Sequence, residues 1–236
     1  MIQFLLGFNM YKNYRNTDLM NQLSIIGVDV LDIMVTGVTG SGKSTTLNSI
    51  FQKDIAKVGK GVDPETMNLT SYNLNGSFRL WDTPGLGDGI QKDKEHSRHI
   101  IELLYKDYSL SNKQYGFIDT VLVIIEGSNR DMGTNYKLLN EVIVPNFQKS
   151  RILVAVNQAD MAMKGRHWDF DSNKPMLKLK TFLEAQADSI QNRVKEATGV
   201  EIIRPIYYSA EYNYNIDVLL DLLIDNMPNE KRELKI

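Results

Sequence analysis

The chain has 236 residues, of which 42% are hydrophobic and 24% are charged, and its formal net charge is −2. This length allows one large domain, or one domain with an appendage, around a packed core. So small a net charge gives no general attraction to nucleic acid or anionic lipid. The absence of cysteine excludes disulfides, thiolate zinc sites and cysteine nucleophiles. It also fits a reducing compartment, so we expect a cytoplasmic protein.

The chain begins with MIQFLLGFNMYKNYRN, whose apolar part is too short to span a bilayer. It has neither the basic start nor the small-residue cleavage site of a signal peptide, and we expect no transmembrane segment. Residues 1–29 are predicted to form a helical extension that packs on the domain. A helix that docks on a membrane or a partner is the alternative, because Phe4, Leu5 and Phe8 would share one helical face.

Apolar runs alternate with helical patterns along the rest of the chain, which is typical of βα units and a mostly parallel sheet. Strands are expected at residues 30–36, 66–74, 77–82, 120–125, 152–156 and 203–208. Helices are expected at residues 43–52, 94–105, 134–143, 176–197 and 216–226, with Gly199 ending the fourth. Asn75-Gly76 suits a tight hairpin turn, so the second and third strands should be antiparallel. The charged tail, residues 229–236, is expected to fray.

Residues 37–44, GVTGSGKS, fit the pattern G-x-x-x-x-G-K-[ST] at every fixed position and lie between a predicted strand and a predicted helix. Small residues let backbone N–H groups converge on phosphates, and the helix N-terminus adds partial positive charge. Lys43 would reach the β- and γ-phosphates, and the Ser44 hydroxyl would bind Mg²⁺. An incidental glycine-rich turn is the alternative. The other nucleotide contacts predicted here come from Gly37, Thr39, Gly40, Ser41, Gly42 and Thr45.

Two further segments are placed to respond to a γ-phosphate. Asp82 ends a predicted strand and would hold Mg²⁺, directly or through water, and the Gly85 N–H would meet the γ-phosphate. Thr66, in the run DPET, would close over Mg²⁺ with its hydroxyl when that phosphate is present. Taken alone, D-x-x-G is a common turn, and Thr66 is equally consistent with an ordinary β-branched strand residue.

The segment ILVAVNQAD places Asn157 and Asp160 at the carboxyl end of a buried strand, where ligands bind in such sheets. A carboxylate at Asp160 would accept from guanine N1–H and from the 2-amino group together, whereas adenine offers neither donor. Such a site rejects the wrong base because its buried polar groups are left unpaired. After the next strand, Ser209 and Ala210 would bring the Ala210 N–H to guanine O6. An Asx turn is the alternative interpretation of N-x-x-D.

In chain order, the motifs GVTGSGKS, PET, DTPG, NQAD and SAE resemble those of the small GTPase domains of the translation-factor class. Within that class the chain looks like the Era-like branch, and there like bacterial large-ribosomal-subunit-binding-type GTPases. The resemblance covers residues 32–228. It implies an α/β, three-layer P-loop domain over residues 30–228, with a six-stranded, mostly parallel sheet and one antiparallel edge pair. It also implies Mg²⁺-GTP as the ligand and hydrolysis of GTP to GDP.

The resemblance also assigns individual roles. Lys43 and Ser44 would hold phosphate and Mg²⁺, with Thr66 as the switch I threonine. Asp82 and Gly85 would belong to switch II. The residues expected to act in the chemistry are Lys43, Thr66, Gly85 and Arg130, those expected to hold the metal are Ser44, Thr66 and Asp82, and those expected around the base are Asn157, Gln158, Asp160, Ser209 and Ala210.

Three residues depart from the family pattern. Gln158 stands where the family usually has a lysine whose stem covers the base, and glutamine has a shorter stem. Leu86 stands where relatives with efficient chemistry often carry a water-orienting glutamine, so we expect slow intrinsic hydrolysis. Gly40 stands where some potassium-activated relatives have asparagine, so a potassium requirement is not supported. The glycine also resembles septin-like and chloroplast-import-receptor GTPases, which pair across their nucleotide sites.

Other candidate residues have simpler interpretations. His96 and His99 would form a metal pair at helical spacing, but a solvated helix face is the preferred interpretation. Trp168 would cap the nucleotide or bind a partner, and simple packing is preferred. Arg130, in the loop EGSNRDMGTN, is a candidate for stabilising charge in cis or in trans, although most loop arginines are solvated.

The sequence therefore predicts a Mg²⁺-dependent GTP-binding protein that hydrolyses GTP slowly and works as a molecular switch. One alternative is a ribosome-associated assembly GTPase, which the charge does not support because it provides no basic RNA-binding surface. The other is a nucleotide-gated scaffold that oligomerises at a membrane. We expect that two copies of the chain can form a nucleotide-dependent homodimer. The sequence does not identify any other protein partner.

Overall fold

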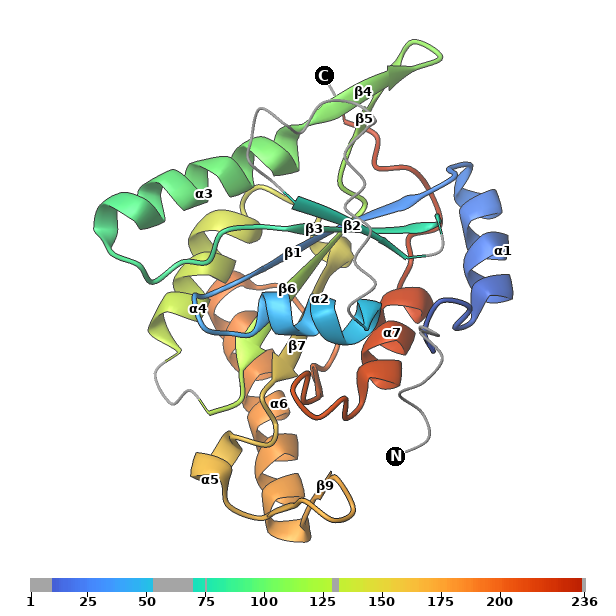
Figure 1. Ribbon diagram of the computed structural model, residues 1–236. Coiled ribbons are helices and arrows are strands. Elements are labelled where there is room, and N and C mark those ends of the chain that lie inside the picture. The colour runs from blue at the N-terminus through green and yellow to red at the C-terminus, as the bar shows by residue number, and fades with distance from the viewer. Residues whose placement is uncertain (1–9, 53–69, 75, 129–131, 235–236) are drawn as a thin grey trace.

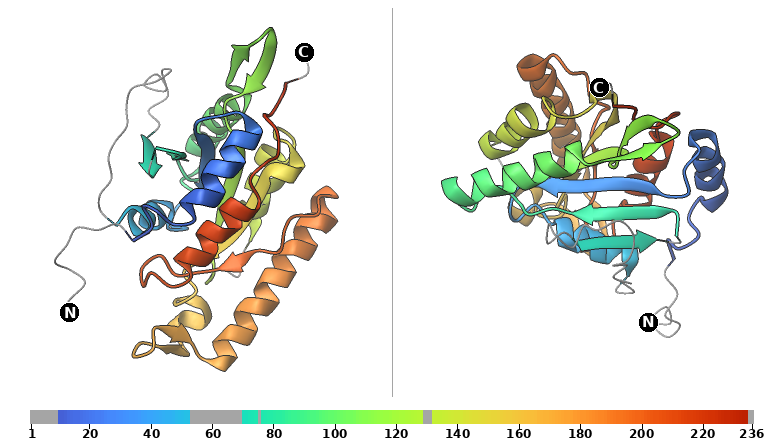
Figure 2. Two further views of the ribbon diagram at one scale, coloured as in Figure 1. Left: turned by 90° about the vertical axis from the view of Figure 1, so that its right-hand side faces the viewer. Right: turned by 90° about the horizontal axis from the view of Figure 1, so that it is seen from above.

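The structure, a computed structural model, describes residues 10–52, 70–74, 76–128 and 132–234. A six-stranded sheet runs through the middle of the molecule and carries helices on both faces (Figure 1; Figure 2). The strand order is β10-β7-β6-β1-β3-β2, and β2 is the edge strand that runs antiparallel to its neighbour. The predicted three-layer α/β fold with one antiparallel edge pair is thus confirmed.

The sheet strands are β1 (Leu31–Gly37), β2 (Thr70–Leu74), β3 (Phe78–Asp82), β6 (Thr120–Glu126), β7 (Ile152–Asn157) and β10 (Ile206–Tyr207). One face of the sheet is covered by α1 (Asn16–Ile26), α2 (Lys43–Phe51) and α7 (Ile216–Asp225). The other face is covered by α3 (Ile90–Tyr105), α4 (Gly133–Lys137) with a π-helical continuation (Leu138–Ile143), and α6 (Leu177–Thr198).

The central strands are apolar because both of their faces are covered. Every residue of β1 and β7 is buried. Successive side chains of a strand point to opposite faces of the sheet. Val154 therefore packs in the helical layer that contains α3, and Leu153 packs in the layer that contains α2. This continuous burial is the mark of a parallel sheet with helices on both faces. The buried strands hold their own carboxyl ends in fixed positions, and the loops that line the candidate site begin at these ends.

Several predicted element ends differ from those observed. The strand expected at residues 203–208 is only Ile206–Tyr207, because Pro205 has no N–H for a ladder bond. Helix α3 begins at Ile90, four residues before the predicted start. The other helices expected from periodicity are present, and Gly199 ends α6 with a left-handed φ of 67°.

Smaller elements that periodicity did not predict complete the chain. The hairpin of β4 (Asp107–Leu110) and β5 (Lys113–Gly116) turns at Ser111 and Asn112, whose φ values are both positive. Such a pair of left-handed residues is the tight turn that hairpins prefer. A second short hairpin joins β8 (Trp168–Asp169) and β9 (Lys174–Pro175), and the remaining helical turns are Lys149–Arg151 and α5 (Ala162–Gly165).

The C-terminal tail does not fray as far as residue 234, so this prediction is wrong. The Arg232 side chain is only 6% exposed. Its guanidinium donates to Leu104 O at 2.7 Å and to Ile118 O at 3.0 Å. Leu234 N also donates to Gln114 O at 2.9 Å, which adds the tail to the β4–β5 hairpin. Hydrogen bonds to buried carbonyls, rather than composition, hold this charged segment.

At the other end of the chain, α1 lies against α7 (Figure 2). Tyr14 Oη donates to Asp221 at 3.0 Å, and Arg15 forms ion pairs with Asp221 and Asp225 at 2.9 and 2.7 Å. The apolar face proposed for Phe4, Leu5 and Phe8 lies outside the described residues. Within the described part of the chain, no helix has the length and apolar character needed to cross a bilayer.

Candidate functional site

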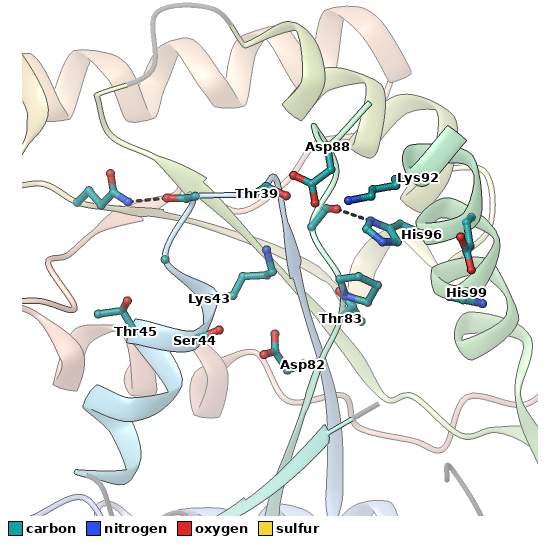
Figure 3. A pocket seen from close by; sticks show the side chains of 16 residues that line it. Thr39, Lys43, Ser44, Thr45, Asp82, Thr83, Asp88, Lys92, His96 and His99 are labelled. Atoms are coloured by element: carbon teal, nitrogen blue, oxygen red, sulfur yellow. Dashed lines mark hydrogen bonds between the residues drawn. The ribbon is translucent and has the colours of Figure 1, made fainter. Parts of the chain in front are cut away.

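The carboxyl ends of β1, β3 and β7 meet at one edge of the sheet, and the segments that follow β1 and β3 line an open cleft of about 890 Å³. Helix α3 forms the opposite wall of the cleft with Lys92, His96 and His99 (Figure 3). Gln158, in the segment after β7, also lines the cleft. The structure therefore brings together most of the predicted phosphate and metal residues. Those that line the cleft are Thr39, Gly40, Gly42, Lys43, Ser44, Thr45, Asp82 and Gly85.

Lys43 begins α2 and extends its ammonium group into the cleft (Figure 3). Only 9% of the residue is exposed, and Nζ donates to Gly37 O and Val38 O at 3.2 Å each. Burial lowers the pKa of Lys43, while the nearby charges of Asp82 and Asp88 raise it. A buried cation whose hydrogen-bond partners are neutral carbonyls is well placed to gain from an incoming phosphate.

The glycines of the loop let the backbone turn around the cleft. Gly40 and Gly42 have φ values of 86° and 84°, a region that strains any residue with a Cβ. A Cβ at Gly42 would also overlap the side-chain amide of Asn157. The loop is thus closely packed against the segment that follows β7.

Asp82 ends β3 beside Ser44, and its Oδ1 is buried with no hydrogen-bond partner among the described residues. Burial raises the pKa of Asp82, and this rise is opposed by the charge of Lys43 and by the nearby polar groups of Ser44 and Thr83. The described residues include no group of three or more His, Cys, Asp or Glu that would cage a metal. Mg²⁺ prefers oxygen ligands and is commonly held by one or two protein groups together with phosphate oxygens and water. The Ser44 hydroxyl and the Asp82 carboxylate therefore fit this ion.

Asn157 connects the two loops that flank the predicted base site. Its Nδ2 donates to Ser41 O, and its Oδ1 accepts from Ala210 N, both at 3.0 Å. The residue is only 1% exposed, so it braces the loops rather than presenting a free amide to a ligand. The Ala210 N–H, predicted to contact guanine O6, is already donated to Asn157 in this arrangement. Ser209 is buried, and its backbone pairs with Tyr214, which shapes the same loop.

Asp160 has a carboxylate oxygen that is free to accept hydrogen bonds from a guanine base. It is only 6% exposed, and its Oδ1 is buried with no hydrogen-bond partner among the described residues. The loop that carries it is fixed on both sides, because Ala159 N donates to Tyr208 O and Met161 N donates to Gln158 O, each at 3.0 Å. A buried carboxylate oxygen without a donor is costly unless a ligand supplies one. Guanine offers two adjacent N–H groups for such an oxygen pair.

Gln158 reaches across to the phosphate loop, where its Nε2 donates to Gly40 O at 2.7 Å. Its φ of 60° is left-handed, which is uncommon for a residue with a side chain and is held here by the surrounding bonds. The shorter glutamine therefore still spans the distance from the base loop to the phosphate loop.

The sequence did not indicate the position of His96. Its Nδ1 lies 2.6 Å from Gly85 O, and both His96 and His99 line the cleft (Figure 3). Both histidines are half-buried and border the open cleft, because α3 turns this face toward the segment after β3, and among the described residues they belong to no metal-binding cluster. Leu86 is 1% exposed and packs in the core beneath α3, so its side chain does not reach the cleft. Trp168 is also buried, at 4% exposure, and packs against Tyr212 and Tyr214.

Two predicted residues are not placed. Thr66, with the rest of the DPET run, and Arg130 lie outside the described residues. The roles assigned to them remain predictions.

The sheet topology, the glycine-rich loop ahead of α2 and the carboxylate at the end of β3 define a P-loop nucleotide-binding domain. Residues 32–158, more than half of the chain, match the family described as 50S ribosome-binding GTPase. The chain belongs to this family and is a GTPase. The predicted recognition and the predicted guanine nucleotide are confirmed at this level.

Solved structures of GTP-binding proteins share the fold. Toc33 from Arabidopsis thaliana in complex with GDP and Mg²⁺ is similar with a TM-score of 0.63 and 16% identity over 96% of each chain. A dimerization-deficient arginine mutant of Toc33 has a TM-score of 0.65 and 16% identity over 98% of this chain and 99% of its own. A GTP-binding protein from Sulfolobus solfataricus in complex with GDP has a TM-score of 0.53 and 20% identity over 90% of this chain and 57% of its own. No curated protein matches the chain significantly.

Proposed function

We propose that this GTPase is a Mg²⁺-dependent molecular switch that converts GTP to GDP slowly. The observation that carries the proposal is a pair of buried carboxylate oxygens without partners among the described residues, one on Asp82 and one on Asp160. Asp82 ends β3 and Asp160 follows β7, and these two strands lie on opposite sides of β1 in the sheet. One suits a hard cation beside the phosphates and the other suits guanine N–H donors.

Phosphate binding rests on charge and on the backbone. The N–H groups at the start of α2 and in the loop converge on the phosphates, and the helix N-terminus adds partial positive charge. Lys43 would exchange two neutral carbonyl partners for anionic phosphate oxygens, which make stronger hydrogen bonds with a buried ammonium. Mg²⁺ supplies further neutralisation of charge on the β- and γ-phosphates.

Slow chemistry follows from the residue after Gly85. Leu86 is buried beneath α3 and has no polar group with which to place the attacking water. Switch GTPases without an activating group turn over at about 10⁻⁴ to 10⁻³ per second. Turnover this slow lets the two nucleotide states persist, which suits a switch better than a metabolic enzyme.

Nucleotide titration and single-turnover hydrolysis test this proposal directly. Fluorescent GTP and GDP should bind far more tightly than ATP and ADP, and GTP hydrolysis should require Mg²⁺ and fall in the slow range above. Equal affinities for guanine and adenine nucleotides would contradict the proposal that Asp160 selects a guanine base. A turnover number near one per second without any partner would remove the slow-switch proposal.

A nucleotide-dependent homodimer is a second candidate, favoured by Gly40 in the phosphate loop and by the similarity to Toc33, for which a dimerization-deficient mutant has been solved. Ribosome association, which the family description suggests, is a weaker candidate because the net charge of −2 offers no excess of cations for RNA.

A further inference from the structure

His96 and Gly85 join α3 to the segment that follows β3. The distance from His96 Nδ1 to Gly85 O is 2.6 Å (Figure 3). A carbonyl oxygen has no proton to give, so Nδ1 carries the proton and donates it. Asp93 ties the next residues to the same helix, since its Oδ1 accepts from Gly87 N at 2.8 Å and from Asp88 N at 3.1 Å. Helix α3 thus holds this segment at several points.

On its other side, the same segment lies directly on the phosphate loop. Thr39 N donates to Leu86 O at 2.7 Å, and Val38 pairs with Leu86 in a parallel bridge. A Cβ built on Gly85 would lie 2.7 Å from Thr39 N and 2.8 Å from Lys43 Nζ. Gly85 is therefore packed closely against the backbone of Thr39 and against the Lys43 ammonium group.

This packing affects the two guanine nucleotides differently. The γ-phosphate of GTP needs the space around Lys43 that Gly85 now fills, and it needs N–H donors such as that of Thr39. GDP has no third phosphate and leaves this contact in place. Binding of GTP must therefore displace residues 85–86, whereas binding of GDP need not. A hydrogen bond that holds residues 85–86 against the phosphate loop is lost only when GTP binds, so it disfavours the GTP-bound state and not the GDP-bound state.

We propose that His96 is a positioning residue that holds residues 85–86 on the phosphate loop and so biases the protein toward GDP over GTP. The proposal rests on the guanine nucleotide function proposed above. The Leu86 side chain anchors the segment in the core under α3, and the His96 hydrogen bond fixes the carbonyl next to it. A single hydrogen bond of this kind is worth roughly a three- to tenfold change in an equilibrium constant.

The test is the ratio of dissociation constants for a non-hydrolysable GTP analogue and for GDP, measured with Mg²⁺ on the full chain. His96→Leu removes the donor and retains bulk, and His96→Ala removes both. His96→Asn keeps a donor, because its Nδ2 is attached at the same place along the side chain as His Nδ1. Arg98→Ala is the matched control, since Arg98 lies on the same helix with a side chain that is 68% exposed.

In His96→Leu and His96→Ala, the preference for GDP over the GTP analogue should fall roughly three- to tenfold, almost entirely through tighter binding of the analogue. His96→Asn should restore most of the preference, and Arg98→Ala should leave it unchanged. Hydrogen exchange of the amides at residues 85–88 in the nucleotide-free protein should speed up in the two donor-free variants and slow again in His96→Asn.

An unchanged ratio in both donor-free variants, or a ratio that moves further toward GDP, would overturn the role of His96. Failure of His96→Asn to restore the ratio would overturn the hydrogen bond as its cause. Either result leaves guanine nucleotide binding by the unmodified protein intact. If the unmodified protein binds no guanine nucleotide, the proposed function itself fails, and the two failures are therefore distinguishable.

Discussion

The Asn157 side chain fastens the phosphate loop to the base loop by donating to Ser41 O at 3.0 Å. The same side chain accepts from Ala210 N at 3.0 Å, so three loops depend on one buried amide. Asn157→Ala leaves a buried carbonyl and a buried N–H without partners. We expect a loss of about 1–3 kcal/mol in the free energy of unfolding, together with weaker nucleotide binding.

Urea unfolding and nucleotide titration of Asn157→Ala check this prediction. Asn226→Ala is the matched control, because it removes a local hydrogen bond to Leu222 O at the end of α7 and does not line the cleft. The control should bind nucleotide normally. Full affinity in Asn157→Ala would mean that the loops are positioned without this brace.

Replacing Asp160 should change which base is preferred. Asp160→Asn puts a donor in place of an acceptor opposite position 2 of the base, and xanthine carries a carbonyl there in place of the guanine amino group. We expect affinity for GTP to fall and affinity for XTP to rise, so that the preference inverts. Competition titrations with both nucleotides measure it, with Asp171→Asn, on the exposed loop after β8, as the control. A variant that still prefers GTP would remove Asp160 from base recognition.

Lys43 and Ser44 should fail in different ways. Lys43→Ala removes a cation that faces concentrated negative charge, so triphosphate affinity should fall roughly 10- to 150-fold, the range for a hydrogen bond to a charged group. Ser44→Ala should mainly raise the Mg²⁺ concentration needed for turnover. Titrations of nucleotide and of Mg²⁺ separate the two effects. Lys195→Ala, on the exposed end of α6, is the control.

The buried carboxyl of Asp119 predicts a pH dependence of stability. Burial raises the pKa of Asp119 from its ordinary 3.8 to about 7, and Asp32 N donates to its Oδ2 at 2.9 Å. Between those two pKa values the folded protein binds more protons than the unfolded chain, so this group makes stability fall as pH rises from about 4 to about 7. Asp119→Asn should flatten that part of the profile, as measured by urea unfolding at each pH. An equally steep profile in the variant would contradict the assignment.

The sequence predicted the sheet and the phosphate loop well because their signals are local. The apolar run at residues 152–156 predicts a strand by itself, and the motif GVTGSGKS predicts a phosphate-binding loop by itself. The contacts of His96 and Arg232 could not be predicted this way. Each depends on which distant backbone carbonyl the fold brings close, Gly85 O in one case and Leu104 O in the other, and no spacing in the sequence encodes that.

The last prediction concerns pairing of two copies across the nucleotide site. Leu86 has no polar group with which to place the attacking water, and a supplied arginine adds about 10³-fold or more to GTP hydrolysis in related chemistry. Arg130 remains the candidate for this group, presented by a second copy. We expect a dimer favoured by a non-hydrolysable GTP analogue, and a specific activity that rises with protein concentration and is lost in Arg130→Ala. Light scattering and turnover over a wide dilution series measure both. A monomer whose specific activity is independent of concentration would refute pairing and leave activation to a different partner.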